Sequence, residues 1–195
     1  ESASISVPVT ATRCGRSTSA STPPPVPTRI GCAHTEANSD VGVGLMGRRA
    51  PAHAARWSRA AERAGLGSLW FVEDYFQPGA YAIAGAGAAA TERIAIGLGV
   101  LNPFTRHPAV LAMETATLTG LAPGRVVLGL GTSNRRWIEE QMGLPFKTPH
   151  AVLADGVAVL RRLLAGETVT HEGGAFTLRD VLLECDVPAV PPILL

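Results

Sequence analysis

The sequence predicts an α/β protein built on a parallel sheet, and two observations carry this prediction. Strand-length apolar runs alternate with helical patterns at short spacing, which calls for parallel strands joined by right-handed crossovers. Polar residues follow the second, third and fourth runs, so these strand ends should meet at one rim of the sheet. A doubly wound sheet and a (β/α)₈ barrel both fit this pattern. No run is followed by the GxGxxG fingerprint of a dinucleotide-binding fold, since residues 129–131 carry only a lone GxG.

Each element is predicted from its hydrophobic period and from the glycine and proline residues at its boundaries. Pro51 suits the first turn of a helix, Gly65 suits a helix stop, and Pro123-Gly124 suits a turn. The expected strands are 41–45, 68–72, the apolar start of 94–108, and 126–130. The expected helices are about 51–64, 79–91, 108–121, 135–142 and 150–165.

The stretch 94–108 is the centre of the prediction. It begins as an apolar run, as a strand buried on both faces should, and glycines interrupt it at 97 and 99. Such glycines mark a bulge or the close approach of a ligand or another backbone, although packing glycines in an ordinary core strand would give the same pattern. A (β/α) barrel places its site at the carboxyl end of such a strand. The loop there carries Asn102, Thr105, Arg106 and His107.

Composition and charge exclude several classes of protein. Hydrophobic residues make up 46% of the chain, enough for a core, and the formal net charge of +1 gives no reason to expect nucleic acid or an anionic membrane as a partner. No apolar run reaches the roughly 18 residues of a spanning helix. The three cysteines, Cys14, Cys32 and Cys185, are odd in number and follow no metal-ligand spacing, so we expect a reduced, cytoplasmic setting.

Residues 1–39 differ in composition from the remainder of the chain. Ser, Thr and Pro dominate, and no helical or strand period is present, so this segment cannot bury enough apolar area to offset its ordering entropy. We expect a disordered leader, or material foreign to the domain, followed by a single domain over 40–195. The separations of Cys14, Cys32 and His34 fit no familiar metal site.

Four motifs follow one another in order: AAERAGLGSLW at 60–70, TERIAIGLGVLNP with RHP at 91–103 and 106–108, GRVVLGLG at 124–131, and LLAGETV with Phe176 at 163–169. Together they resemble the luciferase-like monooxygenase family, which includes reductases and dehydrogenases that use the deazaflavin coenzyme F-420. The likeness covers about residues 40–195. It implies a TIM-type barrel that binds F-420, or FMN as the alternative, with hydride transfer at the ring.

The resemblance also implies site residues. In the F-420 members a non-prolyl cis peptide in the third strand bulges against the deazaflavin, and the matching bond here is Gly99–Val100. Asp74 and Asn134 match positions that take part in catalysis, and no metal is implied. The implied cofactor-binding residues are Asp74, Gly99, Val100, Asn102, His107, Gly131 and Thr132.

Three side chains depart from the family's pattern or allow two interpretations. Tyr75 stands where many members carry His, so proton transfer by that His is not inherited, and the tyrosine either positions substrate or is structural. Asn134 occupies an often acidic position but cannot titrate, which leaves a hydrogen-bonding role. His107 either faces the ring or bonds its own turn, and Glu73 and Asp74 could equally form a solvated rim or a helix cap.

Length is the largest departure. A TIM barrel takes about 250 residues, whereas this sequence has 195 and reaches only the expected start of strand five. We therefore expect about the first four β/α units of a barrel plus part of the insertion, with two exposed sheet edges and poor cofactor binding by the chain alone. The predicted function is an F-420-dependent oxidoreductase acting on a small-molecule substrate, dimeric in the intact family member. The alternatives are an FMN-dependent monooxygenase and a non-catalytic scaffold or truncated remnant.

Overall fold

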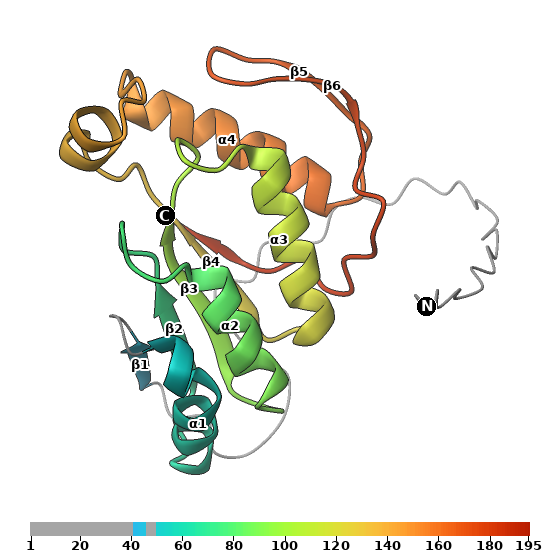
Figure 1. Ribbon diagram of the computed structural model, residues 1–195. Coiled ribbons are helices and arrows are strands. Elements are labelled where there is room, and N and C mark those ends of the chain that lie inside the picture. The colour runs from blue at the N-terminus through green and yellow to red at the C-terminus, as the bar shows by residue number, and fades with distance from the viewer. Residues whose placement is uncertain (1–40, 46–49) are drawn as a thin grey trace, which may run out of the picture. The chain divides into compact units, whose positions relative to one another are not determined.

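The computed structural model describes residues 41–45 and 50–195, so the predictions for residues 1–39 lie outside the described part of the chain. A five-stranded parallel sheet has the order β1-β2-β3-β4-β7 (Figure 1). Its strands are β1 (Gly42–Leu45), β2 (Ser68–Val72), β3 (Ala95–Leu101), β4 (Val126–Leu130) and β7 (Ile193–Leu194). The α-helices are α1 (Ala50–Arg63), α2 (Ala80–Ala89), α3 (Pro108–Leu121) and α4 (Pro149–Leu164).

The predicted α/β alternation is confirmed, and three elements agree with the prediction at both ends: β2, α3 and β4. The segment expected as a helix over 135–142 is a π-helix, η1 (Arg136–Gln141), in which the Met142 amide bonds the carbonyl of Trp137 five residues back. The residues expected to begin a fifth strand form β7, which pairs in parallel with β4. In this sheet the strands therefore lie in the order in which they occur in the chain, and β7 forms the edge next to β4.

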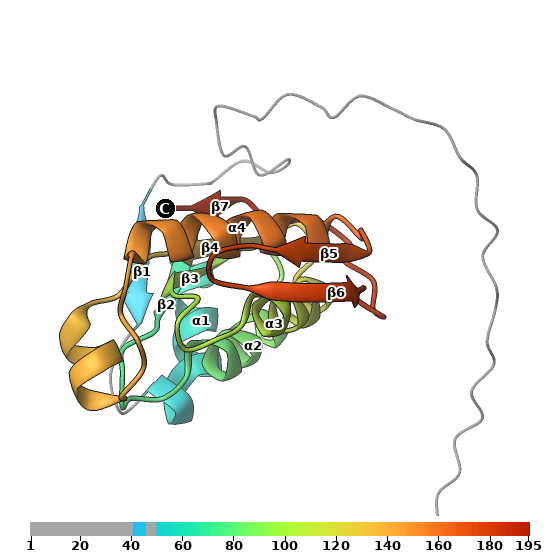
Figure 2. The same cartoon turned by 90° about the horizontal axis from the view of Figure 1, so that it is seen from above.

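An antiparallel hairpin, β5 (Val169–Glu172) and β6 (Thr177–Val181), was absent from the sequence prediction. Its strands are short and mostly exposed, with only Val169 and Leu178 buried, so they carry little hydrophobic period. The hairpin lies alongside α4 (Figures 1 and 2). Asp155 of α4 joins them, because its carboxylate bonds His171 Nε2 at 2.6 Å and accepts from the amides of Ala175 and Phe176.

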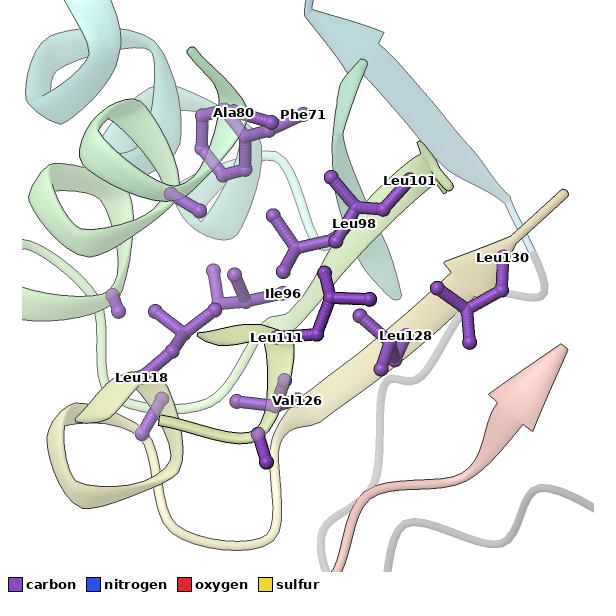
Figure 3. Close-up of a cluster of buried hydrophobic side chains, with 14 of the residues drawn as sticks. Phe71, Ala80, Ile96, Leu98, Leu101, Leu111, Leu118, Val126, Leu128 and Leu130 are labelled. Atoms are coloured by element: carbon purple, nitrogen blue, oxygen red, sulfur yellow. The ribbon is translucent and has the colours of Figure 1, made fainter. Parts of the chain in front are cut away.

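The core lies between the sheet and its helices. Leu69 and Phe71 of β2 are fully buried, while Trp70 between them points to the opposite face, as the two-residue period of a strand requires. Figure 3 shows Phe71, Leu98 and Leu128 from three neighbouring strands gathered toward the helix side chains of Ala80, Leu111 and Leu118. One face of the sheet is therefore packed by helices, and the alternate side chains of the strands lie on the other face.

Glu62, near the end of α1, binds the backbone of the segment that leads into β3. Its carboxylate accepts hydrogen bonds from the backbone amides of Glu92, Arg93 and Ile94 at 3.0, 2.7 and 2.9 Å. Burial acts to raise the pKa of Glu62, but these three amides outweigh it, and the pKa lies below its ordinary value of 4.5. The bonds fix where β3 starts relative to α1.

We expect Glu62→Gln to lower the free energy of unfolding at pH 7 by about 1–3 kcal/mol, because a charged acceptor of several amides is lost. A carboxylate with a depressed pKa contributes stability that is present above pH 4.5 and lost as the pH falls through the folded-state pKa. The difference between parent and variant should therefore shrink below pH 4.5 in urea-unfolding measurements. The exposed Glu172→Gln is the control, and an equal effect of both changes would contradict the assignment.

Within the described residues, no helix has both the length and the apolar character needed to cross a membrane.

Candidate functional site

A cleft of about 740 Å³ opens at the carboxyl ends of β2, β3 and β4, on the rim where the sequence placed the site. Parallel strands bring their carboxyl ends to one edge, so residues far apart in sequence meet there. Five lining residues are apolar side chains or glycine and lie in the strands or in η1. The other six carry polar or charged groups and lie in the loops. They are Trp70, Val72, Gly99, Val100 and Trp137, with Glu73, Asp74, Tyr75, Asn102, Ser133 and Asn134.

Where β2 and β3 form one wall of the cleft, a tryptophan of β2 lies beside glycines of β3, which have no side chain. Trp70 is in register with Gly97, and a Cβ at Gly97 would lie 2.3 Å from the indole. A Cβ at Gly99 would lie 3.2 Å from the same ring. The indole N–H donates to Ser68 Oγ at 3.0 Å, which fixes the ring over the two glycines. The glycines at 97 and 99 therefore make room for a tryptophan of the neighbouring strand, which is the packing alternative. The bulge that they also predict is present, because the register of β3 with β4 shifts between Leu98 and Leu101.

The Gly99–Val100 peptide bond is cis, at the position that the family resemblance indicated. The Gly99 carbonyl accepts from the Glu73 amide at 3.0 Å, which joins β2 and β3 beyond their regular pairing. Val100 is 53% exposed although Leu98 and Leu101 beside it are fully buried, and it lines the cleft. A Cβ at Gly131 would come within 2.8 Å of Val100 Cγ1. Any other residue at position 131 would therefore push the Val100 side chain out of its present position.

Asn102 is buried and organises the loop after β3. Its Oδ1 accepts from the amides of Phe104 and Thr105 at 3.0 and 3.1 Å and from Thr105 Oγ1 at 3.3 Å. Because these bonds fix the oxygen, the amide nitrogen is directed to the Tyr75 hydroxyl and donates to it. The Tyr75 hydroxyl also lies 3.3 Å from Thr105 Oγ1, and its ring meets Trp137 edge-on at 5.2 Å. Tyr75 is thus held at the cleft by partners from the loop after β3 and from η1.

Behind the cleft, Arg106 lies between two carboxylates. It pairs with Glu73 and with Glu114, whose Oε2 is 3.1 Å from Arg106 Nε, and its guanidinium lies over the Tyr81 ring. Burial raises the pKa of Glu114, and Arg106 opposes that shift without cancelling it. Burial also raises the pKa of the Tyr81 phenol, which bonds Thr115 Oγ1 at 2.8 Å. Glu73 additionally accepts from the Ala80 amide at 2.7 Å, so it caps α2 and is tied to the Arg106 network.

The two candidate catalytic residues both line the cleft. Asp74 is half-buried, and its Oδ2 accepts from Gln77 Nε2 at 2.8 Å. Asn134 is exposed, and its Oδ1 accepts from the Trp137 amide at 3.1 Å at the start of η1. Because that oxygen already accepts a hydrogen bond, the amide N–H groups of Asn134 are its available donors.

The remaining predicted residues lie at different places. His107 is exposed and stands outside the cleft lining, where its Nδ1 accepts from the Ala109 amide at 3.2 Å and its ring meets Phe176 edge-on at 5.4 Å. This is the arrangement in which the histidine bonds its own turn. Gly131 lies behind Val100, and Thr132 Oγ1 donates to the Ser133 carbonyl at 3.3 Å. The structure thus brings together Asp74, Gly99, Val100, Asn102 and Asn134.

The geometry is that of a barrel site, and the comparisons agree with it. A family model described as luciferase-like monooxygenase matches residues 26–194. The chain belongs to this family. A coenzyme F-420-dependent glucose-6-phosphate dehydrogenase of Beutenbergia cavernae is 41% identical over 155 residues, which are 73% of this chain and 45% of that protein. A 5,10-methylenetetrahydromethanopterin reductase of Methanolobus tindarius is 32% identical over 61% of this chain and 36% of its own length.

Solved structures of luciferase-like proteins share the fold. The coenzyme F-420-dependent tetrahydromethanopterin reductase of Methanopyrus kandleri has a TM-score of 0.69 at 25% identity, over 80% of this chain and 50% of that one. The monooxygenase RslO1 of Streptomyces bottropensis has a TM-score of 0.67 at 25% identity, over 73% of this chain and 46% of that one. The chain thus spans about half the length or less of these relatives and carries part of a luciferase-like TIM barrel.

The cleft of this luciferase-like chain combines apolar surface with polar groups. An exposed aliphatic side chain, Val100, lies in a cleft that also has the aromatic side chains of Trp70 and Trp137 in its lining. Ser133 lines the same cleft, and its Oγ is buried and has no hydrogen-bond partner among the described residues. An apolar surface with a few directed polar groups is the usual lining of a ligand site.

Sequence reasoning missed Trp70, Val72, Ser133 and Trp137 as cleft residues. A signal existed for the first two, because residues 70 and 72 alternate with the buried 69 and 71, and therefore face away from the helices. Ser133 belongs to the polar residues that follow β4, which the sequence placed at the rim as a group. No local signal marks Trp137, since η1 brings it to the cleft.

Proposed function

We propose that this chain supplies the ring-binding wall for coenzyme F-420 in an oxidoreductase that moves hydride between the deazaflavin and a small organic substrate. The observation that carries the proposal is the exposed Val100 side chain, which lines the cleft at the carboxyl ends of the barrel strands. When bound, F-420 would supply the hydride chemistry at its ring. The chain's own residues would bind and orient the ring and exclude water from it.

The polar residues of the cleft would have separate roles. Asp74 has one carboxylate oxygen held by Gln77, so the group is oriented and can accept a hydrogen bond from a ligand. Asn134 can donate a hydrogen bond through its amide nitrogen but cannot transfer a proton. The Tyr75 hydroxyl, held by Asn102, would position substrate at the cleft. His107, which lies outside the cleft, would act through the start of α3 rather than on the ring.

A second candidate is an FMN-dependent monooxygenase built on the same barrel. The similarity to the monooxygenase RslO1 favours it, at a TM-score of 0.67. The curated relatives support F-420 first, because the proteins at 41% and 32% identity are named as an F-420-dependent dehydrogenase and a methylenetetrahydromethanopterin reductase. The homodimer and the cytoplasmic location remain predictions.

A paired titration of the full chain with F-420 and with FMN tests the proposal. Two of the three tryptophans, Trp70 and Trp137, line the cleft, so ring binding should quench the intrinsic fluorescence. We expect saturable quenching and thermal stabilisation by F-420 in preference to FMN. Because the chain spans 45% of its dehydrogenase relative, we expect weak binding, with a Kd of about 1 μM or weaker.

The control is Trp57→Phe, which removes the tryptophan of α1 that lies outside the cleft lining and should leave the quenching amplitude intact. Preference for FMN would favour the monooxygenase candidate. Quenching that fails to saturate with either ring, without thermal stabilisation, would contradict ring binding by this chain and favour a non-catalytic scaffold.

A further inference from the structure

Two poor helix formers, Asp155 and Gly156, stand next to each other in the middle of α4. Helix stability alone would favour alanine at both positions. The contacts of the two residues explain their presence, because Asp155 binds the hairpin β5–β6 and Gly156 faces Pro103 of the loop after β3. The hairpin lies alongside α4 (Figure 2), so this helix supports both segments at one place.

Asp155 binds the hairpin through both oxygens of its carboxylate. Oδ1 bonds His171, and Oδ2 accepts from the backbone amides of Ala175 and Phe176 in the turn between β5 and β6. Burial acts to raise the pKa of Asp155, but these bonds outweigh it, and the pKa lies below its ordinary value of 3.8. The carboxylate is therefore charged at neutral pH and fixes the position of the hairpin turn on α4.

The hairpin turn places Phe176 against the loop after β3. The Phe176 ring meets the ring of His107, at the end of that loop, edge-on at 5.4 Å. A Cβ at Gly156 would lie 3.4 Å from Phe176 Cε2 and 3.0 Å from Pro103 Cβ, so both side chains use the surface that this glycine leaves open on α4. The loop after β3 is therefore in contact with α4 at one end and with the hairpin at the other.

That loop carries Asn102, the buried residue whose amide nitrogen donates to the Tyr75 hydroxyl at the cleft. We propose that Asp155 is a positioning residue for the cleft, because it holds the hairpin so that Phe176 fixes the loop that carries Asn102. Asp155 itself lies outside the cleft lining, so it acts through this loop. The inference deepens the proposed function, on which its effect on ring binding rests.

Amide hydrogen exchange of the full chain without ligand tests this role. The amides of Phe104 and Thr105 donate to Asn102 Oδ1, so their exchange rates report directly on the loop. Asp155→Ala removes the carboxylate that binds the hairpin, and we expect both loop amides to exchange about 10-fold faster in this variant.

A second variant, Gly173→Ala, keeps Asp155 and displaces its carboxylate. A Cβ at Gly173 would lie 2.4 Å from both Asp155 oxygens and from His171 Nε2, so we expect the loop amides to exchange faster here as well. The control is Thr170→Ala, which removes the 2.6 Å bond between Thr170 and Asp180 within the hairpin and leaves the bonds to α4 intact. It should leave the exchange rates of the loop unchanged.

The amides of Arg93 and Ile94, which Glu62 binds at the start of β3, serve as the internal reference for global stability. Their exchange rates should be unchanged in both variants. Equal acceleration of these amides and of the loop amides would overturn the inference, because it would show only a loss of global stability. Unchanged exchange of the loop amides in Asp155→Ala and Gly173→Ala would overturn it too.

Ring binding gives the second readout, with whichever of F-420 and FMN binds the parent chain as the probe. Asp155→Ala should weaken the Kd about 3- to 10-fold, measured by tryptophan quenching, and Thr170→Ala should leave it unchanged. If the parent binds a ring and Asp155→Ala binds it equally well, the role of Asp155 is wrong and the proposed function stands. If the parent binds neither ring, the proposed function fails, and the exchange rates of the loop decide the role of Asp155.

Discussion

Gly129→Ala should destabilise the chain by about 3 kcal/mol or more. Gly129 lies in the middle of β4, and a Cβ there would stand 2.7 Å from the Leu98 carbonyl oxygen and 3.4 Å from the Gly99 Cα. Both atoms belong to the backbone of β3, just where the register of the β3–β4 pair shifts between Leu98 and Leu101. Because backbone atoms cannot rotate away, the two strands would have to separate beneath the cleft.

Urea unfolding at pH 7 followed by far-ultraviolet circular dichroism measures this effect. The control is Gly120→Ala on α3, where no atom outside the helix's own backbone lies within 4 Å of the added Cβ. That change should stabilise the helix by up to about 1 kcal/mol, because alanine is the better helix former. Equal stability of the two variants would show that β3 and β4 are not packed as closely as described.

Arg106→Met should be the second most damaging change, with an expected loss of about 2–4 kcal/mol at pH 7. The variant leaves Glu73 and Glu114 facing each other without their cation, and the Glu73 side chain is only 10% exposed. Glu73 also lines the cleft and donates its amide to the Gly99 carbonyl. We therefore expect weaker ring binding in the same variant, although Arg106 itself does not line the cleft.

The pH dependence of the Arg106→Met effect has a definite sign. Burial already raises the pKa of Glu114, and loss of Arg106 would raise it further. A carboxyl with a raised folded-state pKa binds its proton more readily when folded, so the variant should gain stability as the pH falls from 7 toward 4.5. Adding Glu73→Gln and Glu114→Gln to Arg106→Met should restore most of the loss at pH 7. A deficit that is independent of pH and unaffected by those two changes would refute the account.

Several features of this molecule follow from short-range patterns that the sequence displays. The apolar runs of β2 and β4 and the proline at the start of α3 predict those elements at both ends, because hydrophobic period and proline geometry act within one element. The polar residues after β2, β3 and β4 meet at one rim, because parallel strands share a direction. The resemblance to luciferase-like proteins located the cis bond at Gly99–Val100.

Tertiary structure alone decided which side chains form the cleft. Trp70 fills the space over Gly97 only because register places β2 beside β3, and Asn102 reaches Tyr75 across 27 positions of sequence. The orphaned hydroxyl of Ser133 has no sequence signature, because the absence of a partner is a property of packing in three dimensions. The sequence by itself determined the alternation of strands and helices and the rim on which polar groups collect. Packing and register, which join residues far apart in the chain, decided which of those groups face a ligand.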